Sequence, residues 1–452
     1  MKIHIIKSVL YLLALTFLLP CVRNPLTESN AQTPLPSQKS YQFTNGQWFD
    51  GKSFRRQIFF SAGGVLSRKK PAKVDEVIDL QNGYVVPPFA DAHCHHFDSS
   101  YNIAQQLGMY LKDGVFYAKV QTDVRSGALQ IADRVNNRAS VDVLYSHGAL
   151  TSTYGHGVEV YEGLALFYRT GGFTPEQEKK VRASHLREND AYYIINTAED
   201  LEQKWQKILA GKPDFLKIYL LTSEDFEKKK QNLNGIPVGS IGLDPRLVPE
   251  IVRKAHAAGL KVSAHIDTVT DYRIALTAGV DEMAHLPGYY IDLNDDPQKY
   301  ELTEADVKET AKRGVWVDIA PVAYEFLDSQ SSSFKPQVKE RTDAVRVRNL
   351  KLLKRYKVKI AFGSDRYGST PVNDVLYLRK LSVFSNLEML KIWCEDTPRN
   401  IFPNRKIGLL KDGYEASFLV LNGNPLEDFD QIKNIKLRFK QGFFINVDEK
   451  KP

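Results

Sequence analysis

Two histidines one residue apart, His93 and His95, stand at the end of an apolar run within Val86–Asp98. If this run is a β-strand, its side chains alternate between two faces, so both imidazoles point the same way and Cys94 points the other. Two imidazoles side by side at a strand end can hold one divalent metal ion. Taken alone, the pair is explained equally well by two hydrogen-bonded histidines at the edge of a sheet.

Other apolar stretches bring polar residues to the same kind of position. Lys217 lies inside the apolar run Phe215–Leu220, and His265, His285 and Asp365 each end a later run. A lysine in an apolar strand must be charged, paired or modified, because burying an unpaired charge is costly. Each residue alone has a plainer explanation as a core histidine or a helix cap. Their common place at strand ends predicts one shared site.

The elements that must position these residues follow a repeating pattern of helix, glycine and short apolar run. In one repeat, Thr197 with Asp200 predicts a capped helix start, Gly211 ends the helix, and a strand follows. Strand–helix alternation predicts a parallel sheet, and eight such units predict an α/β fold of the (β/α)8 TIM-barrel type. The expected strands are Val85–His93, Val115–Val120, Val141–His147, Phe215–Leu220, Lys261–His265, Val280–His285, Val315–Pro321 and Lys359–Asp365.

The sequence near both ends of the chain lacks the alternation of strands and helices and instead shows short predicted strands separated by turn signals. We predict that residues 41–86 and 405–446 together form a small β-sandwich domain, and that residues 87–404 form the barrel. Two long insertions, Gly157–Asn196 and Thr222–Leu243, follow the carboxyl ends of strands. Loops that cover substrate belong at that face of a barrel, so we expect the insertions to set specificity.

The amino-terminal segment is expected to lie outside the fold. Lys2 and Lys7 precede an apolar run, Ser8–Leu19, that is too short to span a membrane and suits a signal peptide over residues 1–31. Cys21 leaves open a lipoprotein-type signal. The mature chain is therefore expected to be exported, as a periplasmic, secreted or lipid-anchored protein, and to meet a membrane only through such an anchor.

Composition excludes some classes of function. The chain has 452 residues, 43% hydrophobic and 25% charged, with a formal net charge of +7 spread along its length. No basic block interleaved with aromatic residues occurs, so we expect no nucleic-acid partner. After loss of the signal peptide only Cys94 and Cys394 remain, which predicts no disulfide framework. The sequence leaves the oligomeric state open.

Taken as an ordered set, the motifs around these strand ends resemble the metal-dependent amidohydrolase superfamily, in its imidazolonepropionase-like and prolidase-like branch. The resemblance extends from about Tyr41 to Asn446 and includes a closing segment, IGLLKDGYEASFLVLNGNPLED. Any one motif alone is weak, whereas the ordered set is specific. The matching motifs are FADAHCH, DFLKIY, VSAHID, VDEMAHLPG and FGSD.

The resemblance implies a centre of two divalent metal ions, expected to be zinc. Lys217 would be carbamylated and would bridge the two ions, which explains a lysine in an apolar strand. Asp365 would take a proton from the attacking water and pass it to the leaving group. The ligands implied by the resemblance are His93, His95 and Asp365 for one ion, His265 and His285 for the other, and Lys217 for both.

Further residues are candidates for substrate contacts. His156, in the loop Ser152–Gly157, resembles the histidine of the family's Gly-His-Gly loop, and its alternative is a loop histidine without a role. Tyr219 faces the same way as Lys217 and could line the site, or it is simply a packed aromatic residue. Arg366 could meet a substrate carboxylate or form a structural salt bridge. His96 faces away from His95 and is not expected to bind metal.

The function predicted from these residues is hydrolysis of a carbon–nitrogen bond in an amide, cyclic amide or dipeptide. The substrate is a small molecule that the sequence does not name. One alternative is a deaminase or ring-opening hydrolase with a single metal and an unmodified Lys217. Another alternative is a surface protein that keeps the metal site for binding, without turnover.

Overall fold

The computed structural model describes residues 39–288, 290–321 and 334–447. The signal peptide predicted over residues 1–31 lies outside this part of the chain, so export stays a prediction. Across the described residues, no helix is both long and apolar enough to cross a membrane.

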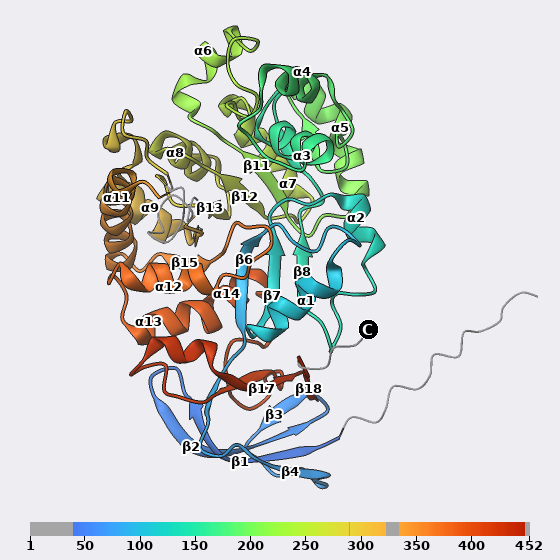
Figure 1. Ribbon diagram of the computed structural model, residues 1–452, viewed down its shortest axis with the longest axis vertical. Helices are drawn as coiled ribbons and strands as arrows, with labels where there is room; N and C mark the ends of the chain where they lie inside the picture. Colours follow the sequence, from blue (N-terminus) through green and yellow to red (C-terminus); the bar gives the residue numbers. More distant parts are fainter. Residues whose placement is uncertain (1–38, 289, 322–333, 448–452) are drawn as a thin grey trace, which may run out of the picture. The chain divides into compact units, whose positions relative to one another are not determined.

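Strands from both ends of the chain pair in one eight-stranded sheet (Figure 1). The pairing is direct, because Val85 stands opposite Val420 in antiparallel register. Buried aromatic rings of Phe43, Phe418 and Phe439 pack edge to face or tilted at 4.9 to 5.1 Å between centroids. The description of this unit as a β-sandwich stays a prediction. Its strands are β1 (Tyr41–Phe49), β2 (Phe54–Ala62), β3 (Val65–Ser67), β4 (Glu76–Asp79), β5 (Tyr84–Val86), β16 (Phe418–Leu421), β17 (Ile435–Lys440) and β18 (Phe443–Phe444).

The strands between these ends pair only in parallel, so the predicted mixed α/β fold with parallel sheets is confirmed. Two short strands, β9 (Ala149–Thr151) and β10 (Tyr192–Ile194), were not expected from the sequence and extend one sheet. The three-stranded sheet contains β6 (Phe89–Cys94), β7 (Val115–Val120) and β8 (Asp142–Tyr145). The seven-stranded sheet has the order β10, β9, β11 (Leu216–Tyr219), β12 (Val262–His265), β13 (Glu282–Ala284), β14 (Trp316–Ile319) and β15 (Lys359–Phe362).

The first expected strand, Val85–His93, was wrong as a single element. It divides into β5, which belongs to the antiparallel-rich sheet, and β6, which begins the parallel strands. Pro87 and Pro88 separate the two strands, and the physical reason is that proline has no backbone N–H to donate to a ladder. This pair of prolines therefore marks where the chain leaves one sheet for another.

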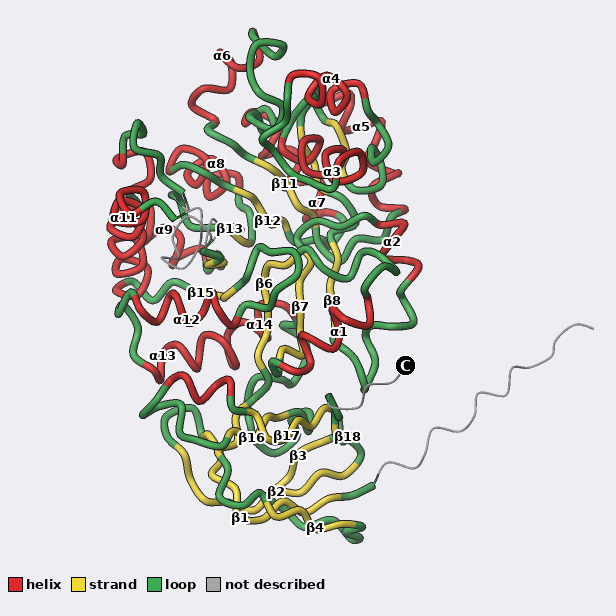
Figure 2. Tube along the Cα trace, in the orientation of Figure 1, coloured by secondary structure: helices red, strands yellow, loops and turns green. Residues whose placement is uncertain are grey.

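Helices alternate with the parallel strands, as Figure 2 shows in red and yellow. The predicted start at Thr197 is confirmed, since its hydroxyl accepts from the Asp200 N–H and the Asp200 side chain accepts in return. The helices are α1 (Ile103–Lys112), α2 (Arg125–Gln130), α3 (His156–Phe167), α4 (Pro175–Ala183), α5 (Ala198–Ala210), α6 (Phe226–Gln231), α7 (Val248–Ala257), α8 (Val269–Ala278), α9 (Glu304–Arg313), α11 (Pro336–Arg355), α12 (Val372–Lys380), α13 (Asn386–Lys391) and α14 (Thr397–Ile401).

A buried polar network joins the two parallel sheets. Lys119 on β7 places its Nζ 2.8 and 2.9 Å from the carboxylate oxygens of Glu282 on β13. Gln121 donates to Glu282 at 2.8 Å and to the carbonyl of Ala92 on β6 at 3.0 Å. Asn400 on α14 donates to the other Glu282 oxygen at 2.7 Å. Side chains from both sheets thus converge on one carboxylate.

We expect a Glu282→Gln variant to lose about 3 to 5 kcal/mol of unfolding free energy, because it leaves Lys119 as a buried charge without its anion. Burial opposes ionisation of Glu282, but Lys119 and the hydrogen bonds of the network outweigh it and lower its pKa. The stabilisation is therefore present above the pKa of an ordinary glutamate and is lost as pH falls toward the lowered value. Urea denaturation at several pH values measures both effects.

Glu309→Gln is the matched control, because Glu309 pairs with Arg313 on the exposed side of α9. Removing that pair should leave the unfolding free energy unchanged within error. Equal stability of the Glu282→Gln and Glu309→Gln variants would contradict the importance of the network.

Candidate metal centre

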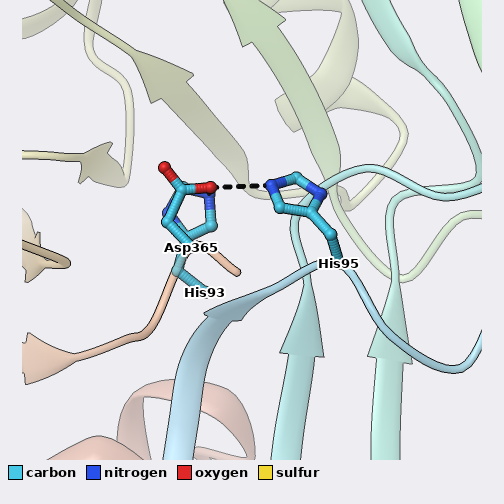
Figure 3. Close-up of side chains that lie close together, drawn as sticks. All are labelled: His93, His95 and Asp365. Carbon is cyan, nitrogen blue, oxygen red and sulfur yellow. Dashed lines mark hydrogen bonds and ion pairs between the residues drawn. The ribbon is translucent and has the colours of Figure 1, made fainter. Parts of the chain in front are cut away.

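The side chains of His93 and His95 face that of Asp365, which is distant in the sequence, at the end of β6 (Figure 3). Nε2 of His95 lies 2.8 Å from Oδ1 of Asp365, and Nε2 of His93 lies 3.2 Å from the same oxygen. One ligand atom from each residue lies within 4.8 Å of the other two. Two imidazoles and a carboxylate at this spacing are suited to bind a single divalent cation.

The backbone after β15 brings Asp365 to the histidines. The N–H groups of Ser364 and Asp365 both donate to the carbonyl of His93, at 3.0 and 2.6 Å. Gly363 allows this approach, because a Cβ at that position would lie 2.5 Å from the Cβ of His93. Asp365 itself has a φ of 52°, in the left-handed region that costs energy for residues other than glycine.

Other groups fix how the two histidines point. Nδ1 of His93 lies 3.0 Å from Oδ2 of Asp318, and Nδ1 of His95 lies 3.3 Å from the carbonyl of Thr122. These contacts engage Nδ1 of each ring and leave Nε2 directed at Asp365. Asp318 is a residue that sequence reasoning missed. Its signal was an acid inside the apolar run Val315–Pro321, an oddity of the same kind as Lys217.

The predicted ligands of a second ion lie beside the first group. The ring centroid of His285 lies 4.6 Å from that of His93 and 4.7 Å from that of His265. Nε2 of His285 also lies 3.5 Å from Oδ2 of Asp365. The structure therefore brings together the four histidines that the sequence predicted as ligands. His285 has a φ of 124°, a second strained backbone position at this site.

Lys217 completes the predicted set from β11. Its side chain is 1% exposed, and its Nζ donates to Oε1 of Gln121 at 3.2 Å. Burial lowers the pKa of Lys217 to about 7, against the opposing attraction of Asp365. A substantial fraction of neutral amine is thus present near neutral pH.

The protonation states at the centre suit a cation. Burial would raise the pKa of Asp365, but His93 and His285 hold it well below its usual value, so the group is a carboxylate. Burial lowers the pKa of His285, which keeps its imidazole in the neutral form that binds metal. For His93, burial lowers the pKa but the carboxylate of Asp365 outweighs it, and the pKa is raised. A protonated His93 is thus the positive partner of the Asp365 carboxylate, and a divalent metal held by the same two imidazoles and carboxylate would take the place of that proton.

Both residues predicted to contact substrate lie at the same centre. The His156 ring centroid lies 5.1 Å from that of His265 and 5.1 Å from that of Tyr219. The Tyr219 hydroxyl is held by a 2.7 Å hydrogen bond to Oγ1 of Thr122. Nδ1 of His156 lies 3.3 Å from a carboxylate oxygen of Glu159, on the next turn of α3.

Three neighbouring residues have structural contacts. Arg366 donates from Nε to Asp374 at 3.2 Å, which corresponds to the salt-bridge alternative. His96 accepts from the N–H of Gly368 at 2.7 Å through Nε2, outside the group of three. Cys94 is buried and donates from Sγ to the carbonyl of Lys119 at 3.6 Å, and neither it nor Cys394 forms a disulfide bond.

Comparison with known proteins gives a match in structure only. No protein-family model matches the sequence, and no curated protein matches it. A solved structure described as an amidohydrolase is 20% identical, with a TM-score of 0.67 over 91% of this chain and 100% of that one. A Xaa-Pro dipeptidase with bound methionine is 17% identical, with a TM-score of 0.65 over 90% and 100%.

The ochratoxinase of A. niger is 16% identical, with a TM-score of 0.68 over 90% of this chain and 96% of that one. At these identities the likeness establishes the fold, and it extends over nearly the whole of each chain. The resemblance that the motifs indicated is thereby confirmed at the level of architecture: the chain shares its fold with solved structures described as an amidohydrolase, a prolidase and a Xaa-Pro dipeptidase.

Proposed function

We propose that this chain is a metal-dependent enzyme that hydrolyses a carbon–nitrogen bond in a small amide, cyclic amide or dipeptide. One observation carries the proposal: His93, His95 and Asp365 converge within ligand distance of one another from β6 and from the segment after β15. Metal-dependent hydrolysis needs such a donor set, and barrel enzymes place it at the carboxyl ends of their parallel strands.

The proposal extends to the architecture. We propose that the two parallel sheets close into one (β/α)8 barrel over residues 87–404, with residues 41–86 and 405–446 as the β-sandwich and residues 1–31 as a signal peptide for export. The Lys119–Glu282 pair supports closure, because it joins β7 of one sheet to β13 of the other. So does the 2.9 Å hydrogen bond from the Asp214 N–H to the Tyr145 carbonyl, between the segments of β11 and β8.

The proposed cofactor is a pair of divalent ions, of which zinc best matches the imidazole-rich donor set. His93, His95 and Asp365 would hold one ion, and His265 and His285 the other. Lys217, carbamylated by carbon dioxide, would bridge them, and its lowered pKa supports this because the neutral amine is the form that reacts. When bound, such ions polarise a carbonyl and make water more acidic.

The chain's own residues would divide the remaining work. Asp365 is ionised, so it can accept a proton from water at the site and return it to the leaving nitrogen. His156 and Tyr219 would orient the substrate, because their rings lie 5.1 Å apart and the His156 ring lies 5.1 Å from that of the proposed ligand His265. The solved structures with the same fold include a Xaa-Pro dipeptidase and an ochratoxinase, which support a C–N bond as the target.

The alternative with a single metal has one observation in its favour. Among the described residues, only His93, His95 and Asp365 have ligand atoms that all lie within 4.8 Å of one another. His265 instead places Nε2 3.4 Å from Asp267. Counting metal ions per chain distinguishes a mononuclear deaminase or ring-opening hydrolase from the binuclear enzyme.

Removing the metal should abolish hydrolysis and leave the chain folded, because the parallel strands are held by their own packed core. The assay is a panel of N-acyl amino acids, dipeptides and lactams, tested before and after dialysis against a chelator. Zinc added back should restore the activity. Undiminished hydrolysis by metal-free protein would contradict the proposal.

A further inference from the structure

The two long insertions, which we expect to set specificity, are joined to each other by hydrogen bonds. Figure 1 shows the helices α3 and α4 of the first insertion and α6 of the second at the same end of the molecule. Glu178 and Arg182 lie one turn apart on α4, in the first insertion. Nη1 of Arg182 donates to the carbonyl of Leu233 at 3.0 Å, and Nη2 donates to the carbonyl of Ile236. Both acceptors belong to the second insertion, in residues 233–243, which we name the clasp loop.

Glu178 adds a further hydrogen bond between the two insertions. Oε1 of Glu178 accepts from Nη2 of Arg182 at 2.6 Å and from the N–H of Val238, in the clasp loop, at 3.0 Å. The Arg182 guanidinium also lies over the Tyr154 ring, 4.6 Å from its centroid, and its side chain is only 15% exposed. A planar fork that serves two carbonyls, a carboxylate and an aromatic face is a use of arginine that lysine cannot reproduce.

The clasp loop in turn touches the segment that carries His156. The N–H of His156 donates to the carbonyl of Ile241 at 3.2 Å, and the N–H of Gly239 donates to the carbonyl of Tyr154 at 2.8 Å. Gly239 packs directly on Glu159, the acid beside His156, because a Cβ there would lie 2.6 Å from the Glu159 Cβ. Its φ of 91° also favours glycine.

The same loop touches the second candidate for substrate contact. The N–H of Leu243 donates to the carbonyl of Tyr219 at 2.8 Å. Gly242 lies against the backbone here, since a Cβ at that position would lie 2.7 Å from the Tyr219 carbonyl oxygen. One short loop therefore contacts the backbone at both His156 and Tyr219, which are 63 residues apart in the sequence.

We propose that Arg182 and Glu178 are positioning residues: they hold the clasp loop in place, and through it they set where His156 and Tyr219 meet the substrate. They act on substrate binding and not on the metal centre, because their hydrogen bonds join the two insertions and the Arg182 guanidinium packs on Tyr154, whereas His93, His95 and Asp365 are held by other residues. This inference rests on the proposed function, since it takes His156 and Tyr219 as substrate contacts.

The test compares Arg182→Ala with Lys180→Ala, a matched control on the same helix. Lys180 pairs with Glu176 across four residues, as Arg182 does with Glu178, but both side chains of that pair are exposed. With a substrate from the panel, Arg182→Ala should raise KM on the order of tenfold with kcat changed less, a size typical of coupling through packed contacts. Lys180→Ala should match the wild type, and metal content should be equal in all three proteins.

Glu178 provides a conservative variant. Glu178→Gln keeps an oxygen that accepts from Val238 and Arg182, so it should retain a KM near that of the wild type, whereas Glu178→Ala should behave like Arg182→Ala. A difference in KM between Glu178→Gln and Glu178→Ala shows that the lost hydrogen-bond acceptor matters, and not merely the presence of a substitution at residue 178.

Hydrogen exchange measures the coupling without any substrate. In Arg182→Ala, the peptides that cover residues 236–243 and 154–158 should exchange faster, and those of β6 should not. Unchanged exchange in residues 236–243 and 154–158 would overturn the inference. So would a fall in kcat and metal content with KM unaltered. If the wild type hydrolyses nothing in the panel, the proposed function fails, while the exchange result still decides whether the two residues hold the clasp loop.

Discussion

A His93→Ala variant should contain no stoichiometric metal and should hydrolyse the panel at the background rate. His93 contacts Asp365 through Nε2 and is oriented by Asp318 through Nδ1. Its loss therefore removes one metal donor and leaves the buried Asp318 without its imidazole partner. Losing several kcal/mol of charge stabilisation in the transition state corresponds to a fall in kcat/KM of at least about a thousandfold. Metal analysis of the purified variant and initial rates measure the two effects.

His256→Ala is the control for this variant. His256 also pairs with an aspartate, Asp281 at 2.9 Å, but it lies on α7 with its side chain 45% exposed. Its removal should leave metal content and rate unchanged. A His93→Ala protein with the full complement of metal and undiminished turnover would contradict the assignment of His93 as a ligand.

Asp365→Asn should separate binding of metal from catalysis. The asparagine keeps the shape of the side chain but cannot act as a base, so kcat should fall by roughly a hundredfold to ten-thousandfold. The loss of a charged donor should also weaken metal binding, but the histidines remain. The measurement is kcat at saturating zinc, which compensates for weaker binding.

Asp412→Asn serves as the matched change, because Asp412 pairs with Arg68 on the surface of the antiparallel-rich sheet. It should leave kcat unaltered. If Asp365→Asn retained the wild-type kcat at saturating zinc, Asp365 would not be the group that moves the proton.

The sequence was informative where chemistry conflicts with local structure. Lys217 lies in an apolar strand, where an unpaired charge is costly, and several histidines share a place at strand ends; together these features predicted one site. The structure places these residues together, with the His285 ring 4.6 Å from that of His93 and 4.7 Å from that of His265. The capped helix at Thr197 was equally readable, because its signal is entirely local.

Features that depend on long-range pairing could not be read in the same way. Asp318 can orient His93 only when β14 lies near β6 in the fold. The residues next to Asp318 in the sequence do not indicate that His93 is its partner. The division at Pro87 and Pro88 was readable from proline chemistry but was outweighed by the length of the apolar run. The contact between the two insertions rests on backbone carbonyls, which leave no trace in residue type.

The most direct test of the central claim is a crystal structure of the protein grown with zinc, with anomalous-scattering data collected at the zinc edge. We expect two peaks, one beside His93, His95 and Asp365 and one beside His265 and His285, with density for a carbamate on Nζ of Lys217 between them. A single peak beside His93 and His95 with an unmodified lysine would support the mononuclear alternative. No peak at these residues in a zinc-saturated crystal would contradict the proposed metal centre.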